Sequence, residues 1–380
     1  MKRLALITVL SLTMLPWRAI AQPVCPGDLN SDGVVTIDEI LGAVNAALNG
    51  CPSSSGEWIV EKRVDIPGTV TSIVADTAGR FAYVSTGTAL VKLDLSASQA
   101  TQIVPFQSSY TTATLVDAID ATGALLSVHG FYGAAVIRLL DLVQTGSLSA
   151  TGVGRTTFAN SSWYLPSPNM GVLIVANTDG SGQHTINPRP GTAPGTINAA
   201  IPRISAASSD GSRVVFDDEQ RGLIHSVDTV TNTLAGTFVV GSQPVAIFVP
   251  DSDHAIVVGD GIIARVDLRN PTAIPQFSHV SFLAGQQQDE AFSSRSTVTI
   301  NRSYTTLVAV KTASSGSGYP TPTPPELGFV TVASGAVSNT MVLDISEAQS
   351  RYVLELLPDG QTVLLGAGQS VYFIRSNTPA

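Results

Sequence analysis

The residues with the clearest chemical pattern lie between Asp28 and Glu39. Acidic and amide side chains stand at alternate positions of this stretch, which reads DLNSDGVVTIDE. Oxygen ligands at positions 1, 3 and 5, a glycine at position 6 and a carboxylate at position 12 are how a calcium loop surrounds its ion. The sequence therefore predicts a Ca²⁺ site, with Thr36 acting directly or through water. Its ligands are Asp28, Asn30, Asp32, the carbonyl of Val34, Thr36 and Glu39.

The competing interpretation is an Asn- and Asp-rich turn that precedes a helix and binds no metal. Gly33 at the sixth position favours the calcium loop, because glycine adopts the sharp turn that converging ligands require. Apolar residues then recur at helical spacing, and Asn49-Gly50 provides a helix C-cap. These apolar residues are Ile37, Ile40, Leu41, Val44, Ala47 and Leu48.

The two cysteines of the chain, Cys25 and Cys51, bracket the calcium loop and its helix. In an oxidising compartment an isolated pair at this separation is most simply a disulfide. Closing a loop of about 27 residues stabilises the folded state by roughly 3–4 kcal/mol through loop entropy. We therefore expect a disulfide-clipped calcium module over residues 22–51.

The calcium loop with its exiting helix resembles a dockerin type I repeat, the half EF-hand known from cellulosome assembly. The resemblance covers residues 26–50. The helix that would enter the loop is missing, because Cys25 and Pro26 leave no room for it. Dockerins carry two such repeats and often place Asp where Glu39 stands, whereas this chain has one copy. The resemblance implies a calcium-stabilised module that either binds another protein or caps the larger domain.

Residues 1–21 have the pattern of a secretory signal peptide. A short basic start precedes an apolar run from Leu4 to Leu15, and Ala19-Ile20-Ala21 supplies an A-x-A cleavage site. We expect cleavage after Ala21 and a secreted or periplasmic protein without a transmembrane segment, because no later run reaches about 18 apolar residues. A lipid-anchored Cys25 is the rival interpretation, but Gln22-Pro23-Val24 lacks the small residue that such processing requires.

The chain is acidic, with a formal net charge of −9 at pH 7. Removing the leader takes away three basic residues, which leaves 17 positive and 29 negative side chains, a charge of −12. Such a charge repels phosphate backbones and anionic lipid surfaces, so nucleic acid is a poor candidate partner. Apolar residues make up 44% of the chain, enough for a large core.

Residues 52–56, PSSSG, form a short linker, and strand patterns dominate from residue 57 to the C-terminus. A turn follows the first strand of each unit, and these turns begin at residues 76, 120, 167, 209, 251, 301 and 359. Their separations match four-stranded, WD40-like blades or slightly exceed them. A low-complexity stretch at 314–325 lengthens the last interval. The sequence predicts an all-β, seven-bladed β-propeller over residues 57–380, with six or eight blades as alternatives.

The best example of the repeat is Leu223 to Pro250, where one blade closes and the next begins. Its motif elements are Val227-Asp228-Thr229, Thr231-Asn232, Val240-Gly241 and Pro244, echoed by Phe81–Ser85 and Leu93-Asp94. This repeat resembles YVTN-type β-propellers, a family of exported or surface proteins. Blade three, about Phe158 to Thr192, matches weakly.

The two ends of the propeller are expected to meet. A strand at 58–66 precedes the first complete repeat, whereas the last unit, 351–376, contains three strands. An open edge would leave backbone groups unpaired. We therefore predict that the N-terminal strand joins the last blade as its outer strand.

Catalytic motifs such as GxSxG, HExxH or a P-loop do not occur in the sequence. The five histidines fall in different predicted blades: His129, His184, His225, His254 and His279. We interpret Asp217-Asp218-Glu219 as a solvated turn between strands rather than a metal site or an acid–base pair. His225 is interpreted as structural rather than a ligand, and Gly259-Asp260-Gly261 as a hairpin turn rather than a phosphate loop.

Two functions remain open. The first is an exported, calcium-binding, monomeric scaffold for a protein or carbohydrate partner. The alternative is a propeller-type hydrolase or lyase, lactonase-like or glycan-degrading, with its active site at the central channel. A catalytic channel should bring several ionisable residues to one mouth and perturb their titration. A channel lined by Ser, Thr and aliphatic side chains would contradict the catalytic hypothesis.

Overall fold

The computed structural model describes residues 58–106, 114–130, 132–150, 152–193, 200–284, 297–311, 325–343, 345 and 352–376. The chain divides into two units, Met1–Ser55 and Gly56–Ala380. The predicted signal peptide, calcium ligands, disulfide and linker, and most of the low-complexity stretch, lie outside the described residues. Within the described part, no helix is long and apolar enough to cross a membrane.

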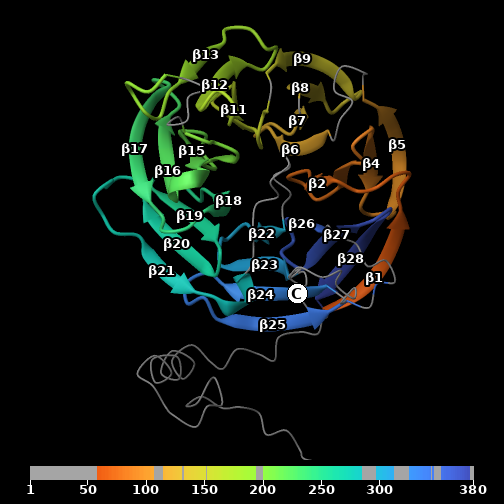
Figure 1. Ribbon diagram of the computed structural model, residues 1–380. Coiled ribbons are helices and arrows are strands. Elements are labelled where there is room, and N and C mark those ends of the chain that lie inside the picture. The colour runs from red at the N-terminus through yellow and green to blue at the C-terminus, as the bar shows by residue number, and fades with distance from the viewer. Residues whose placement is uncertain are drawn as a thin grey trace, which may run out of the picture. The chain divides into compact units, whose positions relative to one another are not determined.

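The second unit is an all-β ring of seven four-stranded antiparallel sheets, which confirms the predicted seven-bladed propeller (Figure 1). Blade one contains β2 (Ser72–Ala75), β3 (Phe81–Ser85), β4 (Ala89–Asp94) and β5 (Gln99–Pro105). Blade two contains β6 (Leu115–Ile119), β7 (Leu125–Gly130), β8 (Gly133–Arg138) and β9 (Val143–Ser149). Blade three contains β10 (Thr157–Ala159), β11 (Ser162–Ser167), β12 (Val172–Asn177) and β13 (His184–Ile186). Blade four contains β14 (Ser205–Ala207), β15 (Arg213–Asp218), β16 (Leu223–Asp228) and β17 (Thr233–Val239). Blade five contains β18 (Pro244–Phe248), β19 (His254–Gly259), β20 (Ile262–Asp267) and β21 (Gln276–His279). Blade six contains β22 (Val298–Ile300), β23 (Thr306–Lys311), β24 (Glu326–Thr331) and β25 (Val337–Val342). Blade seven contains β26 (Tyr352–Leu356), β27 (Thr362–Ala367), β28 (Ser370–Ser376) and β1 (Trp58–Asp65).

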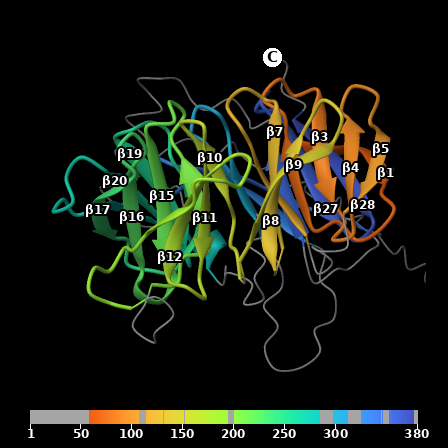
Figure 2. The ribbon, with the colours of Figure 1, turned by 90° about the horizontal axis from the view of Figure 1, so that it is seen from above.

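The first strand of each blade lies nearest the ring axis, and the strands run between the two faces of the ring (Figures 1 and 2). The two middle strands of a blade are buried on both sides, as in β15 and β27. Outer strands such as β17 alternate between exposed and covered residues. This difference follows from position, because a middle strand packs against blades on either side whereas an outer strand faces solvent.

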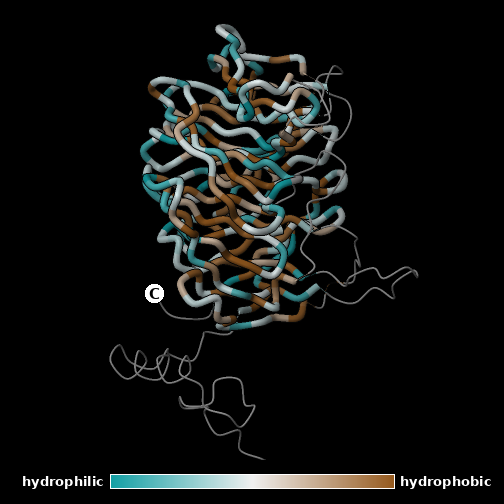
Figure 3. The backbone as a smooth tube through the Cα atoms, turned by 60° about the vertical axis from the view of Figure 1, so that its left-hand side comes forward, coloured by the Kyte–Doolittle hydropathy of each residue, from teal (hydrophilic) through white to brown (hydrophobic). Residues whose placement is uncertain are grey.

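Seven apolar clusters hold the blades together, one at each interface between neighbouring blades. Figure 3 shows the same pattern, with hydrophobic stretches along the strands and hydrophilic stretches at many of the turns. Each blade therefore contributes one apolar face to each neighbour, and no blade has a core of its own. Because burial depends on both neighbours, the ring must be complete to remove its apolar surface from water.

The ring closes as predicted, through pairing of β1 with β28. The antiparallel register runs from Trp58 opposite Ser376 to Asp65 opposite Ser370. The Ser370 hydroxyl donates to the Asp65 carboxylate at 3.1 Å. The Trp58 ring also stacks on Phe329 of blade six at 4.2 Å between centroids. The first described strand thus completes blade seven and packs on the blade before it.

One predicted turn was assigned to the wrong place. The turn at 167–171 joins the second and third strands of blade three, not the first and second. The first turn of that blade is Asn160-Ser161, where both residues have positive φ angles of 45° and 62°. This two-residue turn contains no Gly or Pro, so the Pro and Gly of the next turn give the stronger turn signal in the sequence. The other six predicted turns follow the first strand of their blades.

Outer strands in five blades carry a β-bulge opposite the third strand. In three of them the extra residue is a hydroxyl side chain that donates to a carbonyl of the third strand. These residues are Thr101, Thr145 and Ser338. Bulges interrupt the row of backbone groups that an edge strand offers to another chain, so they limit edge-to-edge aggregation.

Candidate functional site

The candidate site is a cavity of about 300 Å³ at the axis of the ring. It is lined by the first strands of blades two to seven and by the turn after β22. Threonine, serine, alanine and isoleucine make up half of its lining residues, and four charged residues also line it. These charged residues are Asp117, Arg155, Arg302 and Glu355.

Glu355 lies on β26 and faces the cavity. Its Oε1 accepts one hydrogen bond, from the backbone N–H of Ala75 at 3.2 Å. Burial raises the pKa of Glu355 to about 7, although the Ala75 N–H and the positive charge of Arg155 act to lower it. A carboxyl group with so few partners is therefore neutral below about pH 7 and can donate a hydrogen bond as well as accept one.

Asp117, on β6, is the second carboxylate at the cavity and is 3% exposed. It lies 2.7 and 2.8 Å from Nδ1 of His129. It also accepts hydrogen bonds from the backbone N–H and the hydroxyl of Thr156, at 3.0 and 2.8 Å. These contacts join blade two to the chain that enters blade three. Asp117 thus fixes the junction of two blades, and its oxygens are largely used.

Arg155 is held by its backbone at the junction of blades three and four. Its N–H donates to the Arg203 carbonyl at 2.7 Å, and its carbonyl accepts from the N–H and the hydroxyl of Ser205. Gly154 is required beside it, because a Cβ there would collide with the same Arg203 carbonyl. Arg155 lines the cavity, where its charge acts on Glu355, and its guanidinium forms no hydrogen bond or ion pair with the residues that the structure describes. The fixed backbone therefore presents an unused cationic group to the cavity.

Arg302, in the turn after β22, crosses from blade six to blade one. Its guanidinium donates to the carbonyl of Thr77, in the first turn of blade one. This contact links the blades on either side of blade seven. Of the four charged residues at the cavity, Arg302 and Asp117 are therefore engaged by other residues, whereas Arg155 and Glu355 have few partners.

The interpretation of Asp217-Asp218-Glu219 as a solvated turn was wrong. Asp217 and Asp218 end β15 and are both 0% exposed. Asp217 accepts from the N–H groups of Arg203 and Ile204, at 2.6 and 2.8 Å. These carboxylates bind the chain that enters blade four, an arrangement the sequence could not show because the donors are backbone amides about 14 residues away.

Asp218 accepts from the N–H of Ile201 and forms a close ion pair with Arg189. Burial acts to raise the pKa of Asp218, but the nearby His225 and the contacts from Arg189 and Ile201 hold it below its usual value. Glu219 pairs with Arg203 at 2.6 Å. The cluster is therefore a buried clamp between blades three and four.

His225 is 2% exposed, in agreement with a structural role. Its Nδ1 lies 2.9 Å from the Thr237 hydroxyl, and its ring packs on Phe216. The prediction that all five histidines lie in different blades was wrong for two, since His254 and His279 both belong to blade five. Within the described ranges, no cluster of three His, Cys, Asp or Glu could hold a metal ion.

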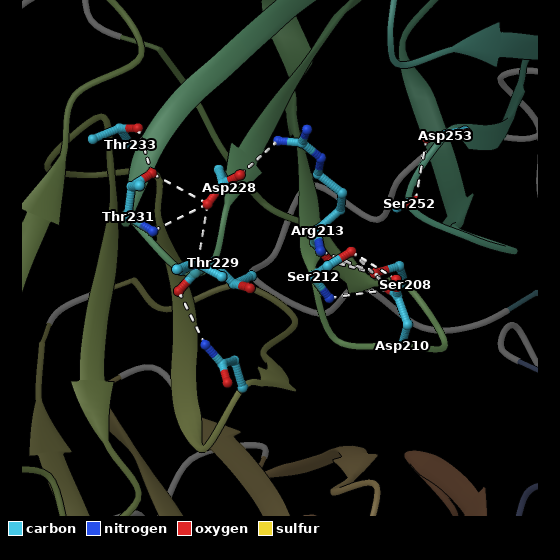
Figure 4. Close-up of polar contacts among 12 residues, drawn as sticks. Ser208, Asp210, Ser212, Arg213, Asp228, Thr229, Thr231, Thr233, Ser252 and Asp253 are labelled. Atoms are coloured by element: carbon cyan, nitrogen blue, oxygen red, sulfur yellow. Dashed lines mark hydrogen bonds and ion pairs between the residues drawn. The ribbon is translucent and has the colours of Figure 1, made fainter.

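The repeat stretch from Leu223 to Pro250 is structural. Asp228 accepts from the N–H groups of Val230 and Thr231, at 3.0 Å each, and pairs with Arg213 at 3.4 Å (Figure 4). Asn232 adopts a φ of 53°, which the turn requires. Asp260-Gly261 forms the hairpin turn between β19 and β20, as predicted, with Gly261 at a φ of 67°.

Arg155, Asp117 and Glu355 were not identified from the sequence. Two of them carried a usable signal, because each is the one charged residue in an otherwise apolar first strand, LVDAI or YVLEL. Arg155 carried none, since it lies between blades, where charged residues are common. The meeting of these residues depends on closure of the ring.

Comparison with known proteins identifies the fold and no family. No protein-family model matches the chain, and no curated protein does. Among solved structures, the β-propeller domain of Cps50 (Swd1) from Myceliophteria thermophila is 12% identical, with a TM-score of 0.64. That match covers 84% of this chain and 100% of the other. A chain of the mitotic checkpoint complex is also 12% identical, with a TM-score of 0.63, and covers 86% of this chain and 94% of the other.

Proposed function

We propose that this protein is an exported, calcium-binding β-propeller that acts as a binding scaffold for a protein or carbohydrate partner. The assignment draws on three features: the signal-peptide pattern, the calcium loop from Asp28 to Glu39, and the propeller. We infer further that the repeats are of YVTN type and that the N-terminal module is dockerin-like, on the motifs quoted above.

The observation that carries the proposal is the polar lining of the axial cavity. Hydroxyl groups and one guanidinium converge there from separate blades. A concave site with a few convergent polar groups is typical of small-ligand binding. The similar propellers give some support to a protein partner, since one is a chain of the mitotic checkpoint complex.

Screening the mature protein, residues 22–380, against saccharides and in pull-downs tests the scaffold function. We expect a saccharide to raise the melting temperature, because a ligand that binds only the folded state stabilises it, or a specific protein to be retained. Each screen is run in calcium and in chelator. Failure of both screens in both conditions would contradict the proposal.

Calorimetric titration of calcium into the mature chain tests the metal site. We expect saturable binding that Asp28→Ala or Glu39→Gln weakens strongly, since each removes a ligand. Asp141→Ala, which removes an exposed carboxylate in a surface turn, is the matched control and should bind as the wild type does. Absence of heat in the wild type at millimolar calcium would contradict calcium binding.

Glu355 gives a specific reason to keep an enzymatic function as the second candidate. A carboxyl of pKa about 7 suits general acid–base catalysis near neutral pH. The other carboxylate at the cavity, Asp117, is held by His129 and Thr156, so a carboxylate pair is not set up for catalysis. Turnover of a lactone or a polyuronate that Glu355→Gln abolishes would favour the hydrolase or lyase over the scaffold.

A further inference from the structure

The axial cavity of this acidic chain is lined by a basic residue whose side chain is not engaged by the residues described. The protein has a formal net charge of −9, and of the two arginines at the cavity Arg302 donates to Thr77, whereas the Arg155 guanidinium has no such contact. Asp117 is already paired with His129 and Thr156. In a narrow cavity with walls of low dielectric, the guanidinium of Arg155 attracts an anion while Glu355 is neutral.

Arg155 is the group best placed to bind that anion. Its backbone is fixed on both sides, by Arg203 and Ser205, so only the side chain has to be ordered when a ligand binds. A guanidinium offers two parallel N–H groups that match the two oxygens of a carboxylate. A ligand carboxylate would therefore bind with little reorganisation.

The rest of the wall suits hydroxyl groups. The Thr299 hydroxyl accepts from the Leu356 N–H at 3.2 Å, which leaves its O–H free to donate. The Ser205 hydroxyl donates to the Arg155 carbonyl and keeps its lone pairs. Thr157 also lines the cavity, and its hydroxyl forms no hydrogen bond with the residues described. Ala206 and Ile247 add apolar surface for the C–H face of a sugar ring.

We propose that the axial cavity binds a uronic acid, with Arg155 pairing with the sugar carboxylate and Glu355, Thr157 and Thr299 hydrogen-bonding its hydroxyl groups. This inference rests on the proposed binding function and specifies its ligand class. A volume of about 300 Å³ is at the lower end of ligand cavities, so it accepts one sugar unit. That unit is either a free monosaccharide or the end of a polyuronate chain.

Glu355 makes the binding depend on pH. The other charged residues that line its cavity are Arg155, Asp117 and Arg302, and Asp76 directly follows Ala75, whose N–H donates to Glu355. Neutral Glu355 can hydrogen-bond a sugar hydroxyl, whereas ionised Glu355 repels the ligand carboxylate and attracts Arg155. Affinity should therefore fall as pH rises through about 7.

Isothermal titration calorimetry on the mature protein tests the proposal. The ligands are D-glucuronate, D-galacturonate and a short oligogalacturonide, with D-glucose and acetate as controls that lack the carboxylate or the hydroxyls. We expect a uronate to bind at pH 6 and to weaken roughly tenfold by pH 8, as a shift of one pKa unit implies. Binding of the oligomer alone identifies a chain end as the ligand, and binding of the monosaccharide identifies the free sugar.

Two variants assign the residues. Arg155→Met should weaken uronate binding at least about tenfold, while Arg155→Lys keeps part of it because the charge remains. Arg269→Met removes an exposed arginine of blade five and is the control with unchanged binding. Glu355→Gln should bind at pH 6 and at pH 8 alike. Circular dichroism and melting temperature establish that each variant is folded, and Arg155→Lys with the pH series tests the site if Arg155→Met does not fold.

Three results would overturn the proposal: no uronate binds, glucose binds equally well, or folded Arg155→Met binds as the wild type does. Loss of the uronate proposal leaves the scaffold function standing if the screens yield another saccharide or a protein. If those screens also fail, both the uronate proposal and the scaffold function are contradicted.

Discussion

Two regions of the ring contain buried carboxylates: the junction of blades three and four, and the axial cavity. The two regions differ in how many hydrogen-bond donors each carboxylate has. At the junction, Asp217 accepts hydrogen bonds from two backbone N–H groups. Asp218 forms an ion pair with Arg189 and accepts a hydrogen bond from the Ile201 N–H. Glu355 accepts a single N–H and faces a cavity. The pKa of Asp218 is lowered, whereas that of Glu355 is raised to about 7.

The difference shows that burial alone does not mark a functional carboxylate. A buried carboxylate with several donors gains enough from them to stay ionised, and its charge then holds elements together. A carboxylate with one donor and free space beside it stays uncompensated, and such groups are candidates for binding or proton transfer. Asp117 tests the distinction, because it faces the cavity like Glu355 yet is bonded like Asp217.

The largest effect is expected at the clamp. Asp218→Ala removes the buried carboxylate that pairs with Arg189 and leaves the Ile201 N–H without its acceptor. Breaking one partner of a buried pair costs about 3–5 kcal/mol, which we expect in the free energy of unfolding measured with urea. Asp267→Ala, which removes an exposed ion pair with Arg269, is the control and should cost no more than about 1 kcal/mol. Equal losses in the two variants would contradict a structural clamp.

Glu355→Gln should raise the free energy of unfolding at pH 8, whereas Asp218→Ala lowers it. Because the pKa of Glu355 is raised in the folded state, its stabilising effect is complete below the ordinary value of 4.5 and is lost as pH rises to about 7. At pH 8 the variant should be more stable than the wild type by up to about 3 kcal/mol, and near pH 4 the two should be equal. Denaturant unfolding from pH 4 to pH 8 measures this. A destabilised Glu355→Gln at pH 8 would show that the carboxylate is structural.

Asp117→Ala should resemble the clamp variant, with a smaller loss. It leaves His129 and the N–H of Thr156 without their acceptor, while the Thr156 hydroxyl still has the Ser127 hydroxyl as a partner. An unsatisfied buried polar group costs about 1–3 kcal/mol. Thermal unfolding gives the size of the loss, and a variant as stable as the wild type would place Asp117 with Glu355 instead.

The smallest effect is expected far from both regions, at the bulge hydroxyls. Thr145→Val removes a hydrogen bond to the Val136 carbonyl while keeping the side-chain shape. We expect a loss of about 0.5–1 kcal/mol by denaturant unfolding, with uronate binding unchanged. A change in binding would mean that the outer strands influence the cavity.

The sequence was sufficient to predict the ring and its closure. Strand patterning and the spacing of turns gave seven blades, and the lone strand at 58–66 with a three-stranded last unit gave the pairing of β1 with β28. The turn spacing repeats along the chain, so one weak blade did not obscure it. The predicted turn of blade three was wrong, because Asn160 and Ser161 adopt the positive φ angles that glycine usually supplies.

The cavity and the clamp could not be predicted in the same way. Glu355 meets Ala75 across 280 residues, and Arg155 lines the same cavity from another blade. Such contacts depend on the closed ring, and the sequence shows the carboxylates of Asp217-Asp218-Glu219 without the amides that bind them. A charged residue in an apolar first strand was the one local sign.

Direct titration of Glu355 tests the central claim most directly. Proton uptake by the mature wild type is compared with that by Glu355→Gln, with and without D-glucuronate. We expect one group that titrates near pH 7 in the wild type alone, with its pKa raised further by the uronate because the added negative charge favours the neutral carboxyl. A Glu355 that titrates near 4.5, or one that the uronate does not shift, would contradict the assignment of the cavity as an anion-binding site.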